Sequence, residues 1–380
     1  MIRLALPLIE KDDLKAVSNT IASGYLVQGK TVESFEQTVA DYVGTKYAVT
    51  VSSCTAALHL SLLAIDIAPG DLILVTSYSW IATANVIELC GAQPVFVDIC
   101  PDTFNMDIEC LETELKRLMR VKHTAKRVKA ILPVHTFGHL ANMPEILEIA
   151  SRYDLYVIED AACALGASFF EQQAGTWGVM GCFSFHPRKT ITTGEGGIIT
   201  TNDFILANKL RELRNHGLDP CASSPDFIMP GYNYRMTEFQ AALGISQMTK
   251  LNHIIDTKCK LAKNYNELLE DTVFKSPYVL YGNKHVYQSY VVLLPDALAD
   301  ERELLIAKLK EKGIETTIGT LNMPMTSYYR SRYAYKSADF PVSNWIFNHS
   351  LTLPLYPTMT KEEQFETIKS LTNLEYTDRK

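Results

Sequence analysis

A lysine occupies a turn-rich link between two apolar segments. Residues 183–197 read FSFHPRKTITTGEGG, and they place Lys189 between strands expected at 182–185 and 197–201. A buried amine beside a cation or a cofactor loses its proton more readily, and the free amine attacks carbonyl groups. The glycines that follow allow positive φ and a close approach to a bound group. Because most single lysines are solvated surface residues, Lys189 needs partners before it indicates chemistry.

Two other segments supply such partners. Residues 155–162 (LYVIEDAA) place Asp160 at the end of a buried strand, where a carboxylate can pair with a protonated ring nitrogen or cap the next turn. Residues 52–57 (SSCTAA) follow a strand and open a helix, which suits a phosphate or an ordinary Ser/Thr cap. An amine, a carboxylate and a phosphate anchor are the three handles of pyridoxal phosphate (PLP).

The elements that position these residues alternate between strands and helices. Apolar strands are expected at 47–51, 72–75, 94–97, 130–134, 155–158, 182–185 and 197–201, with helices at 56–64, 81–89 and 143–153. This pattern predicts an α/β fold whose sheet is covered on both faces. After residue 235 the pattern changes to one long helix or a kinked pair over 237–269, a strand at 290–294 and a charged helix at 300–312. We therefore expect a large domain over 1–245 and a small one over 246–380.

Composition narrows the function classes. The 380 residues are 47% hydrophobic and carry a net charge of −7 with scattered basic residues, which indicates a soluble protein that binds neither nucleic acid nor a membrane surface. No apolar run is long enough for a membrane helix, and the first residues do not resemble a signal peptide. The eight cysteines include no C-x-x-C pair, so we expect no metal site, reduced thiols and a cytoplasmic location.

The chain resembles the DegT-type (DegT/StrS) sugar-nucleotide aminotransferases, which are PLP-dependent and have the aspartate-aminotransferase fold. Matching blocks run almost end to end: 52–60 (SSCTAALHL), 94–98 (PVFVD), 134–138 (VHTFG), 158–167 (IEDAACALGA), 181–197 (GCFSFHPRKTITTGEGG), 213–217 (LRNHG), 231–244 (GYNYRMTEFQAALG) and 351–357 (LTLPLYP). The resemblance implies PLP-dependent transferase fold type I, with a mixed, mostly parallel sheet in the large domain and a small C-terminal α/β domain.

The resemblance also implies roles for individual residues. Lys189 matches the lysine that holds PLP as a Schiff base and moves the proton between the amino donor and the cofactor, and Asp160 matches the partner of the pyridine nitrogen. The other matched cofactor contacts are phosphate binders at Thr55 and Ala56, a ring-stacking aromatic at Trp80 (otherwise an ordinary core aromatic), a hydroxyl near the phosphate or ring oxygen at Ser184, and Asn233, which would reach the phosphate of a neighbouring subunit. Asn233 thus implies a homodimer with shared sites.

Two positions depart from the family pattern. Cys163 stands near the ring where members usually carry Gln or His, and a thiol is a weak hydrogen-bonding group. Pro324 stands where many members have a histidine, which puts substrate contacts there in doubt. Relatives with histidine in place of the lysine are sugar deoxygenases, so Lys189 favours transamination. The form of the 186–197 segment looks more like members that act on 4-keto sugars than on 3-keto sugars.

The predicted function is transfer of an amino group from L-glutamate to a nucleotide-linked keto sugar, with a 4-keto-6-deoxyhexose expected, for amino-sugar and surface-polysaccharide biosynthesis. A diphosphate needs local cations in an acidic protein, and Arg188 and Arg235 are the expected binders unless they form structural ion pairs. His186 either lies by the sugar or braces the turn. The alternatives are an aminotransferase for an 8-amino-octulosonate or an aminocyclitol, and a regulator that kept the fold. A dehydrogenase would need a dinucleotide fingerprint, and residues 194–197 do not provide one.

Overall fold

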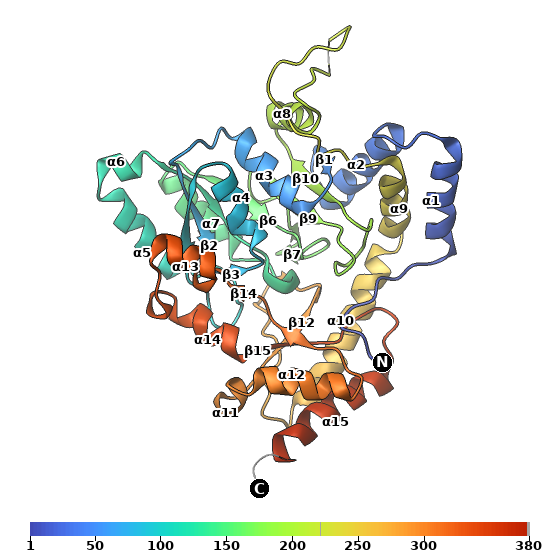
Figure 1. Cartoon of the computed structure of the whole chain (residues 1–380), viewed down its shortest axis with the longest axis vertical. Helices are drawn as coiled ribbons and strands as arrows, with labels where there is room; N and C mark the ends of the chain where they lie inside the picture. Colours follow the sequence, from blue (N-terminus) through green and yellow to red (C-terminus); the bar gives the residue numbers. More distant parts are fainter. Residues whose placement is uncertain (221, 378–380) are drawn as a thin grey trace.

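A seven-stranded sheet forms the centre of the large domain in the computed structural model, which describes residues 1–220 and 222–377 (Figure 1). Its strands, in spatial order, are β1 (Tyr47–Val51), β10 (Gly197–Thr201), β9 (Met180–Ser184), β6 (Tyr156–Asp160), β5 (Val128–Leu132), β2 (Leu72–Thr76) and β4 (Gln93–Val97). The pairings on both sides of β10 are antiparallel, and the other four are parallel. The expected mixed, mostly parallel sheet is confirmed.

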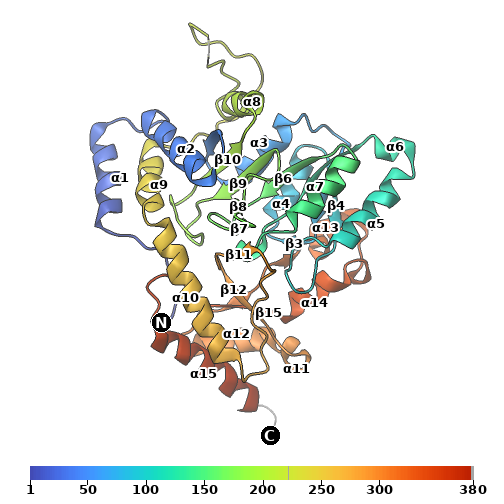
Figure 2. The same ribbon diagram turned by 180° about the vertical axis from the view of Figure 1, so that it is seen from behind.

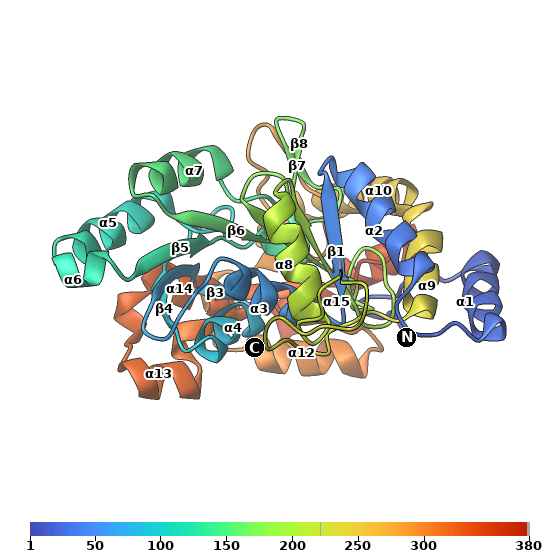
Figure 3. The same cartoon turned by 90° about the horizontal axis from the view of Figure 1, so that it is seen from above.

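Helices cover both faces of this sheet, as Figure 3 shows from above. Along β2, Ile73 and Val75 pack into a core with α3 (Cys54–Ala64), α4 (Ala82–Leu89) and α8 (Phe204–Arg214). The alternate residues Leu72 and Leu74 pack into a second core with α5 (Ile108–Met119) and α7 (Met143–Arg152). Successive side chains of a strand point to opposite faces, so a strand buried on both sides must be apolar throughout. Continuous apolar runs therefore allowed these strands to be predicted from the sequence.

Two strands, β5 and β6, end at other residues than the sequence predicts. The strand expected at 130–134 is β5 at Val128–Leu132, because Pro133 has no N–H to donate to the ladder. Val134 then forms only an isolated bridge with Asp160. β6 continues two residues past the predicted end at 158, so both Glu159 and Asp160 belong to the strand. This extension fixes the backbone of the acidic pair.

The chain after residue 237 forms two helices, α9 (Glu238–Met248) and α10 (Leu251–Leu269), which is the kinked pair of the two expected forms. Figure 2 shows α10 running from the large domain to a second layer that holds a small antiparallel sheet of β12 (Tyr290–Leu293), β15 (Ser350–Leu353) and β13 (Thr317–Ile318). The helices α12 (Arg302–Glu311) and α15 (Lys361–Thr377) belong to this layer. Ile2 and Leu6, from the N-terminal segment, pack against its core. A division of the chain at 245/246 remains a proposal.

Further elements complete the described chain. They are the helices α1 (Lys11–Ser23), α2 (Lys30–Val43), α6 (Lys122–Ala125), α11 (Asp296–Ala299), α13 (Ser327–Tyr333) and α14 (Pro341–His349), and the short strands β3 (Tyr78–Ser79), β7 (Ser168–Phe169), β8 (Gln172–Gln173), β11 (Asn283–Lys284) and β14 (Leu321–Asn322). Within the described residues, no helix is both long and apolar enough to cross a membrane. The seven cysteines found there are free thiols, and Cys221 lies outside the described residues.

Glu238, at the start of α9, holds the beginning of α2. Its carboxylate accepts hydrogen bonds from the backbone N–H groups of Gly29 (2.8 Å), Thr31 (3.0 Å) and Val32 (2.9 Å). These groups have no partner within the helix itself, so a carboxylate there satisfies them and complements the helix dipole. Burial raises the pKa of Glu238, but the hydrogen bonds from Thr31, Val32 and Gly29 lower it by more, to below the usual 4.5.

We expect Glu238→Gln to lower the free energy of unfolding at pH 7 by about 1 to 3 kcal/mol, because one oxygen acceptor becomes a donor that faces other donors. The folded-state pKa lies below the unfolded value, so the ionised form contributes stability above about pH 4.5, and this contribution is lost as the pH falls through the folded-state pKa. Urea unfolding from pH 7 to pH 3 measures this dependence. The exposed Glu171→Gln is the control, and equal stability of both variants at pH 7 would contradict the assignment.

Candidate functional site

Lys189 lies in the loop that joins β9 to β10. Its backbone N–H donates to the carbonyl of His186 (2.8 Å), which forms a tight turn. Its Nζ donates to the Sγ of Cys163 at 3.0 Å. Burial lowers the pKa of Lys189, as expected from the sequence, but Cys163, Cys54 and Asp160 raise it by more, to above the usual 10.5. These neighbouring side chains therefore act to stabilise the ammonium form in the absence of a cofactor.

Asp160 ends β6 with a buried carboxylate that forms no direct ion pair with another described residue. The residue is 4% exposed; its Oδ2 accepts from the hydroxyl of Thr83 (2.7 Å) and its Oδ1 from the N–H of Ala162 (3.2 Å). Burial raises its pKa, while the two hydrogen bonds and the charge of Lys189 act in the opposite direction. Among the described residues, no Lys, Arg or His forms an ion pair with it. A protonated ring nitrogen would supply the missing positive charge.

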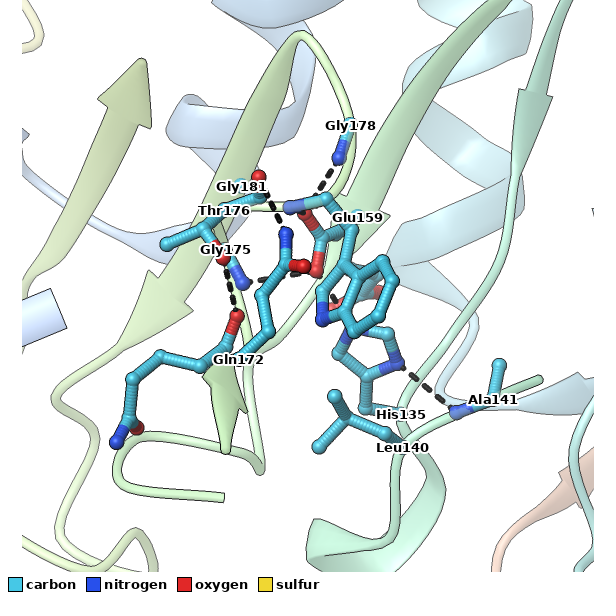
Figure 4. Close-up of polar contacts among 12 residues, drawn as sticks. His135, Leu140, Ala141, Glu159, Gln172, Gly175, Thr176, Gly178 and Gly181 are labelled. Atoms are coloured by element: carbon cyan, nitrogen blue, oxygen red, sulfur yellow. Dashed lines mark hydrogen bonds and ion pairs between the residues drawn. The ribbon is translucent and has the colours of Figure 1, made fainter. Parts of the chain in front are cut away.

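A second buried carboxylate, Glu159, fixes the strand end behind Asp160 (Figure 4). It accepts a hydrogen bond at 2.9 Å from Nε2 of His135, and three more at 2.8 Å from the backbone N–H groups of Gly175, Trp177 and Gly178. Because Nδ1 of His135 accepts from the N–H of Ala141, the ring proton lies on Nε2 and points at Glu159. The N–H of His135 also donates to the carbonyl of Asp160 (3.0 Å). Backbone bonds thus hold Asp160 in place.

The N-terminus of α3 faces the start of β10. Ser53 caps this helix by accepting from the N–H of Ala56 (3.1 Å), so that N–H is already engaged, while Thr55 is exposed. A Cβ on Gly197 would lie 2.5 Å from the carbonyl carbon of Ser53, so only glycine permits this approach. Gly197 is also the register partner of Ser184 at the end of β9. One glycine therefore brings the hydroxyl of Ser184 and the helix N-terminus to the same place, where an anion would be stabilised.

Trp80 follows β3 and is 67% exposed, so the alternative of an ordinary core aromatic is wrong. The hydroxyl of Thr83 lies within hydrogen-bond distance of both the Trp80 carbonyl (3.1 Å) and the Asp160 carboxylate (2.7 Å), which ties the tryptophan to the buried acid. β14 pairs with β3, so the segment that contains the buried Pro324 also lies on this side of the sheet. An exposed indole whose backbone is linked through Thr83 to a buried carboxylate suits a flat aromatic ligand.

The expected substrate residues lie on two loops: His186 and Arg188 between β9 and β10, and Arg235 between α8 and α9. Nδ1 of His186 accepts from the N–H of Arg188 (3.2 Å), so the histidine braces the turn. Arg188 is exposed, and the guanidinium of Arg235 donates to Asn215 (2.5 Å). Neither arginine forms an ion pair with another described residue of this chain. Asn233 is exposed on the loop that carries Arg235.

The sequence analysis missed Thr83, because its link to Asp160 joins residues 77 positions apart. Thr83 is the polar member of the buried face of α4, whose other buried residues are Ala84, Val86 and Ile87, and that was the one available signal. It also missed Glu159 and His135 as a pair, although both stand in the matching blocks.

Comparison with known proteins agrees with this geometry. Residues 7–372 match the DegT/DnrJ/EryC1/StrS aminotransferase family. The chain is 42% identical over 291 residues to GDP-perosamine synthase of Caulobacter vibrioides, covering 76% of each protein. Its structure is similar to that of a DegT DnrJ EryC1 StrS aminotransferase from Brucella abortus (TM-score 0.89, 31% identity, 97% of this chain and 96% of that one). It is also similar to Helicobacter pylori PseC, an aminotransferase involved in the biosynthesis of pseudoaminic acid (TM-score 0.91, 26% identity, 98% of each chain).

We predict that Cys163→Ala lowers the pKa of Lys189, because the thiol contributes to raising it while burial, which lowers it, remains. The rate at which PLP and cyanoborohydride label Lys189 in cofactor-free protein, followed by peptide mass spectrometry against pH, should show its midpoint at lower pH than in the wild type. Cys110→Ala, at an exposed cysteine on α5, is the control. An unchanged or higher midpoint in Cys163→Ala would show that the thiol does not act on the amine.

Proposed function

This chain belongs to the DegT/DnrJ/EryC1/StrS aminotransferase family, and from that premise we propose that it transfers the amino group of L-glutamate to a nucleotide-linked 4-keto-6-deoxyhexose. Members of the family are PLP-dependent sugar aminotransferases. The observation that carries the proposal is the combination of Lys189, in contact with Cys163, and the buried carboxylate of Asp160, which forms no ion pair with another described residue. The product would enter amino-sugar and surface-polysaccharide synthesis, such as that of lipopolysaccharide, in the cytoplasm.

Each side chain of the site then has a task. Lys189 holds the cofactor and carries the proton that leaves the donor's α-carbon, and Cys163 sets the protonation of that amine. Asp160, oriented by Thr83, would keep the ring nitrogen protonated, and the exposed Trp80 would cover one face of the ring. When bound, PLP supplies an electron sink for the charge that develops on the α-carbon. Phosphate binding would fall to Thr55 and Ser184 around the close approach at Gly197, and Ala56 would join them when the phosphate replaces Ser53 as the acceptor of its N–H.

Two observations support the proposal that the acceptor sugar carries a nucleotide. The relative named GDP-perosamine synthase has a GDP-linked sugar in its name, and it shares 42% identity with this chain. Arg188 is exposed next to Lys189 and makes no ion pair with the described residues, so its guanidinium is available for charge-assisted bonds to a diphosphate. Arg235, held by Asn215, would add a second cation, and His186 shapes the turn between substrate and lysine.

We predict that a GDP- or dTDP-linked 4-keto-6-deoxyhexose is aminated with L-glutamate as donor, and that the free keto sugar reacts at least about a hundredfold more slowly in kcat/KM, because the remote binding energy of the nucleotide is lost. Product analysis by mass spectrometry with a panel of both forms measures this. Equal rates would move the octulosonate or aminocyclitol activity to first place. No turnover with any acceptor, despite bound PLP, would favour the regulator.

A homodimer with shared sites is part of the proposal. Exposed apolar side chains concentrate on α1 and the segment after it, namely Leu14, Ile21, Tyr25 and Val27, and a groove of about 310 Å³ runs between α1 and Leu243. A second group, Phe227 and Ile228, lies on the loop after α8 that projects from the body of the chain in Figure 1. Apolar groups in such positions favour burial against a partner. Asn233 lies further along the same loop and would contact the neighbouring phosphate.

We expect complementation between two defective chains. Heterodimers of Lys189→Ala and Asn233→Ala subunits contain one site with both residues intact if Asn233 acts across the interface, and they should regain up to about half the activity of one wild-type dimer. Differently tagged chains, mixed and purified as verified heterodimers, provide the measurement. Activity no higher than that of either parent would show that Asn233 serves its own subunit.

A further inference from the structure

A second lysine is buried close to Lys189. Lys258, on α10, is 4% exposed, and its Nζ donates to the carbonyl oxygen of Gln288 (2.9 Å). Within the described residues no carboxylate pairs with it, although an unpaired ammonium is costly to bury. Burial lowers its pKa to about 8, Cys163 and Cys259 act to raise it, and the charge of Lys189 lowers it. A fold retains such a group where the group has a task.

The contact of Lys258 leads directly to the catalytic loop. The side-chain amide of Gln288 donates to the carbonyl of Arg188 (2.8 Å), the residue joined to Lys189. The same Gln288 donates its backbone N–H to the carbonyl of Phe137 (2.9 Å). Gln288 therefore links α10, the turn at Phe137 and the peptide before Lys189.

The backbone on either side of Gln288 is held by several contacts, so a change at Lys258 can alter the position of Gln288. Val286 donates its N–H to the carbonyl of Gly138 (3.1 Å), and the thiol of Cys259, next to Lys258, donates to the carbonyl of His285 (3.5 Å). Tyr287, between these contacts, has φ of 46°, a left-handed conformation that is strained in a non-glycine residue and persists only where its surroundings impose it.

Cys163 belongs to the same assembly. A Cβ on Gly138 would lie 3.0 Å from the carbonyl oxygen of Cys163 and 3.2 Å from the backbone nitrogen of Gln288, so these two residues flank one point. Cys163 contacts the side-chain amine of Lys189, and Gln288 contacts the peptide before it. Residues packed around Gly138 therefore hold both the side chain and the backbone of the catalytic lysine.

We propose that Lys258 is a positioning residue of the transamination site: its buried amine holds Gln288, which fixes the turn that presents Lys189 to Cys163 and the cofactor. The proposal rests on the assignment of Lys189 as the cofactor lysine. In this role the long side chain of Lys258 donates a hydrogen bond to Gln288 and does not contact the substrate.

The test compares Lys258→Met, Gln288→Met and the double variant, with Lys258→Arg as the conservative replacement and the exposed Lys260→Met, on the same helix, as control. The readouts are the rate at which PLP and cyanoborohydride label Lys189 in cofactor-free protein, kcat of the loaded enzyme and the thermal midpoint. We expect each single variant to slow labelling about tenfold, the double variant to be no more than about twofold slower still, and Lys258→Arg to recover much of the loss.

The titratable groups that interact electrostatically with Lys258 are Cys163, Cys259, Lys189 and His285. Labelling is therefore measured over the full pH range, so that a slower reaction of Lys189 can be distinguished from a change in its pKa. A lower thermal midpoint with unchanged labelling of Lys189 would overturn the proposal, as would additive effects of the two substitutions. If Lys258→Met does not fold, Gln288→Met carries the same prediction alone. Label that maps to another residue in the wild type would instead overturn the assignment of Lys189, whatever Lys258 does.

Discussion

A buried carboxylate at the end of β6 that forms no ion pair with another described residue is the constraint on which the site depends. Asp160 is 4% exposed, and two hydrogen bonds, from Thr83 and Ala162, replace only part of the solvation that it loses. Burial of a carboxylate without an ion-pair partner costs several kcal/mol. The charge of Lys189 offsets only part of this cost at Asp160, and a cationic ligand would offset more. The neighbouring Glu159 shows the contrast, because its four hydrogen bonds satisfy both oxygens and leave it a structural role. One strand end thus carries one acid for the fold and one for the cofactor.

The other parts of the site are arranged around that acid by the sheet. Parallel strands bring their carboxyl ends to one edge, and the reversed strand β10 returns the chain so that Gly197 meets the N-terminus of α3. The loop between β9 and β10 then has to cross this edge, and it carries Lys189. The backbone carbonyl of Trp80 and the carboxylate of Asp160 both lie within hydrogen-bond distance of the hydroxyl of Thr83. Amine, acid, aromatic ring and phosphate anchor therefore follow from one sheet topology.

Features with local chemical causes could be predicted from the sequence. Strands buried on both faces are apolar throughout, and Lys189 and Asp160 stand in blocks whose types and spacing indicate PLP. The contacts of Thr83 and Gln288 join segments 77 and 100 positions apart, and no local pattern encodes such packing. Whether Arg188 and Arg235 form ion pairs depends on which carboxylates lie near them in space, and the sequence does not show this. The protonation of Lys189 depended on Cys54 and Cys163, whose proximity only the folded chain shows.

The central claim is that Lys189, and no other lysine, holds the cofactor. Lys258 is the sharpest rival, because it is buried nearby and its pKa is lowered to about 8, whereas that of Lys189 is raised. Borohydride reduction of the wild-type protein loaded with PLP, followed by peptide mass spectrometry, separates the two. The account predicts a stable pyridoxyl adduct on Lys189 in stoichiometric amount, absent from Lys189→Ala. An adduct on Lys258, or Lys189→Ala with normal turnover, would contradict it.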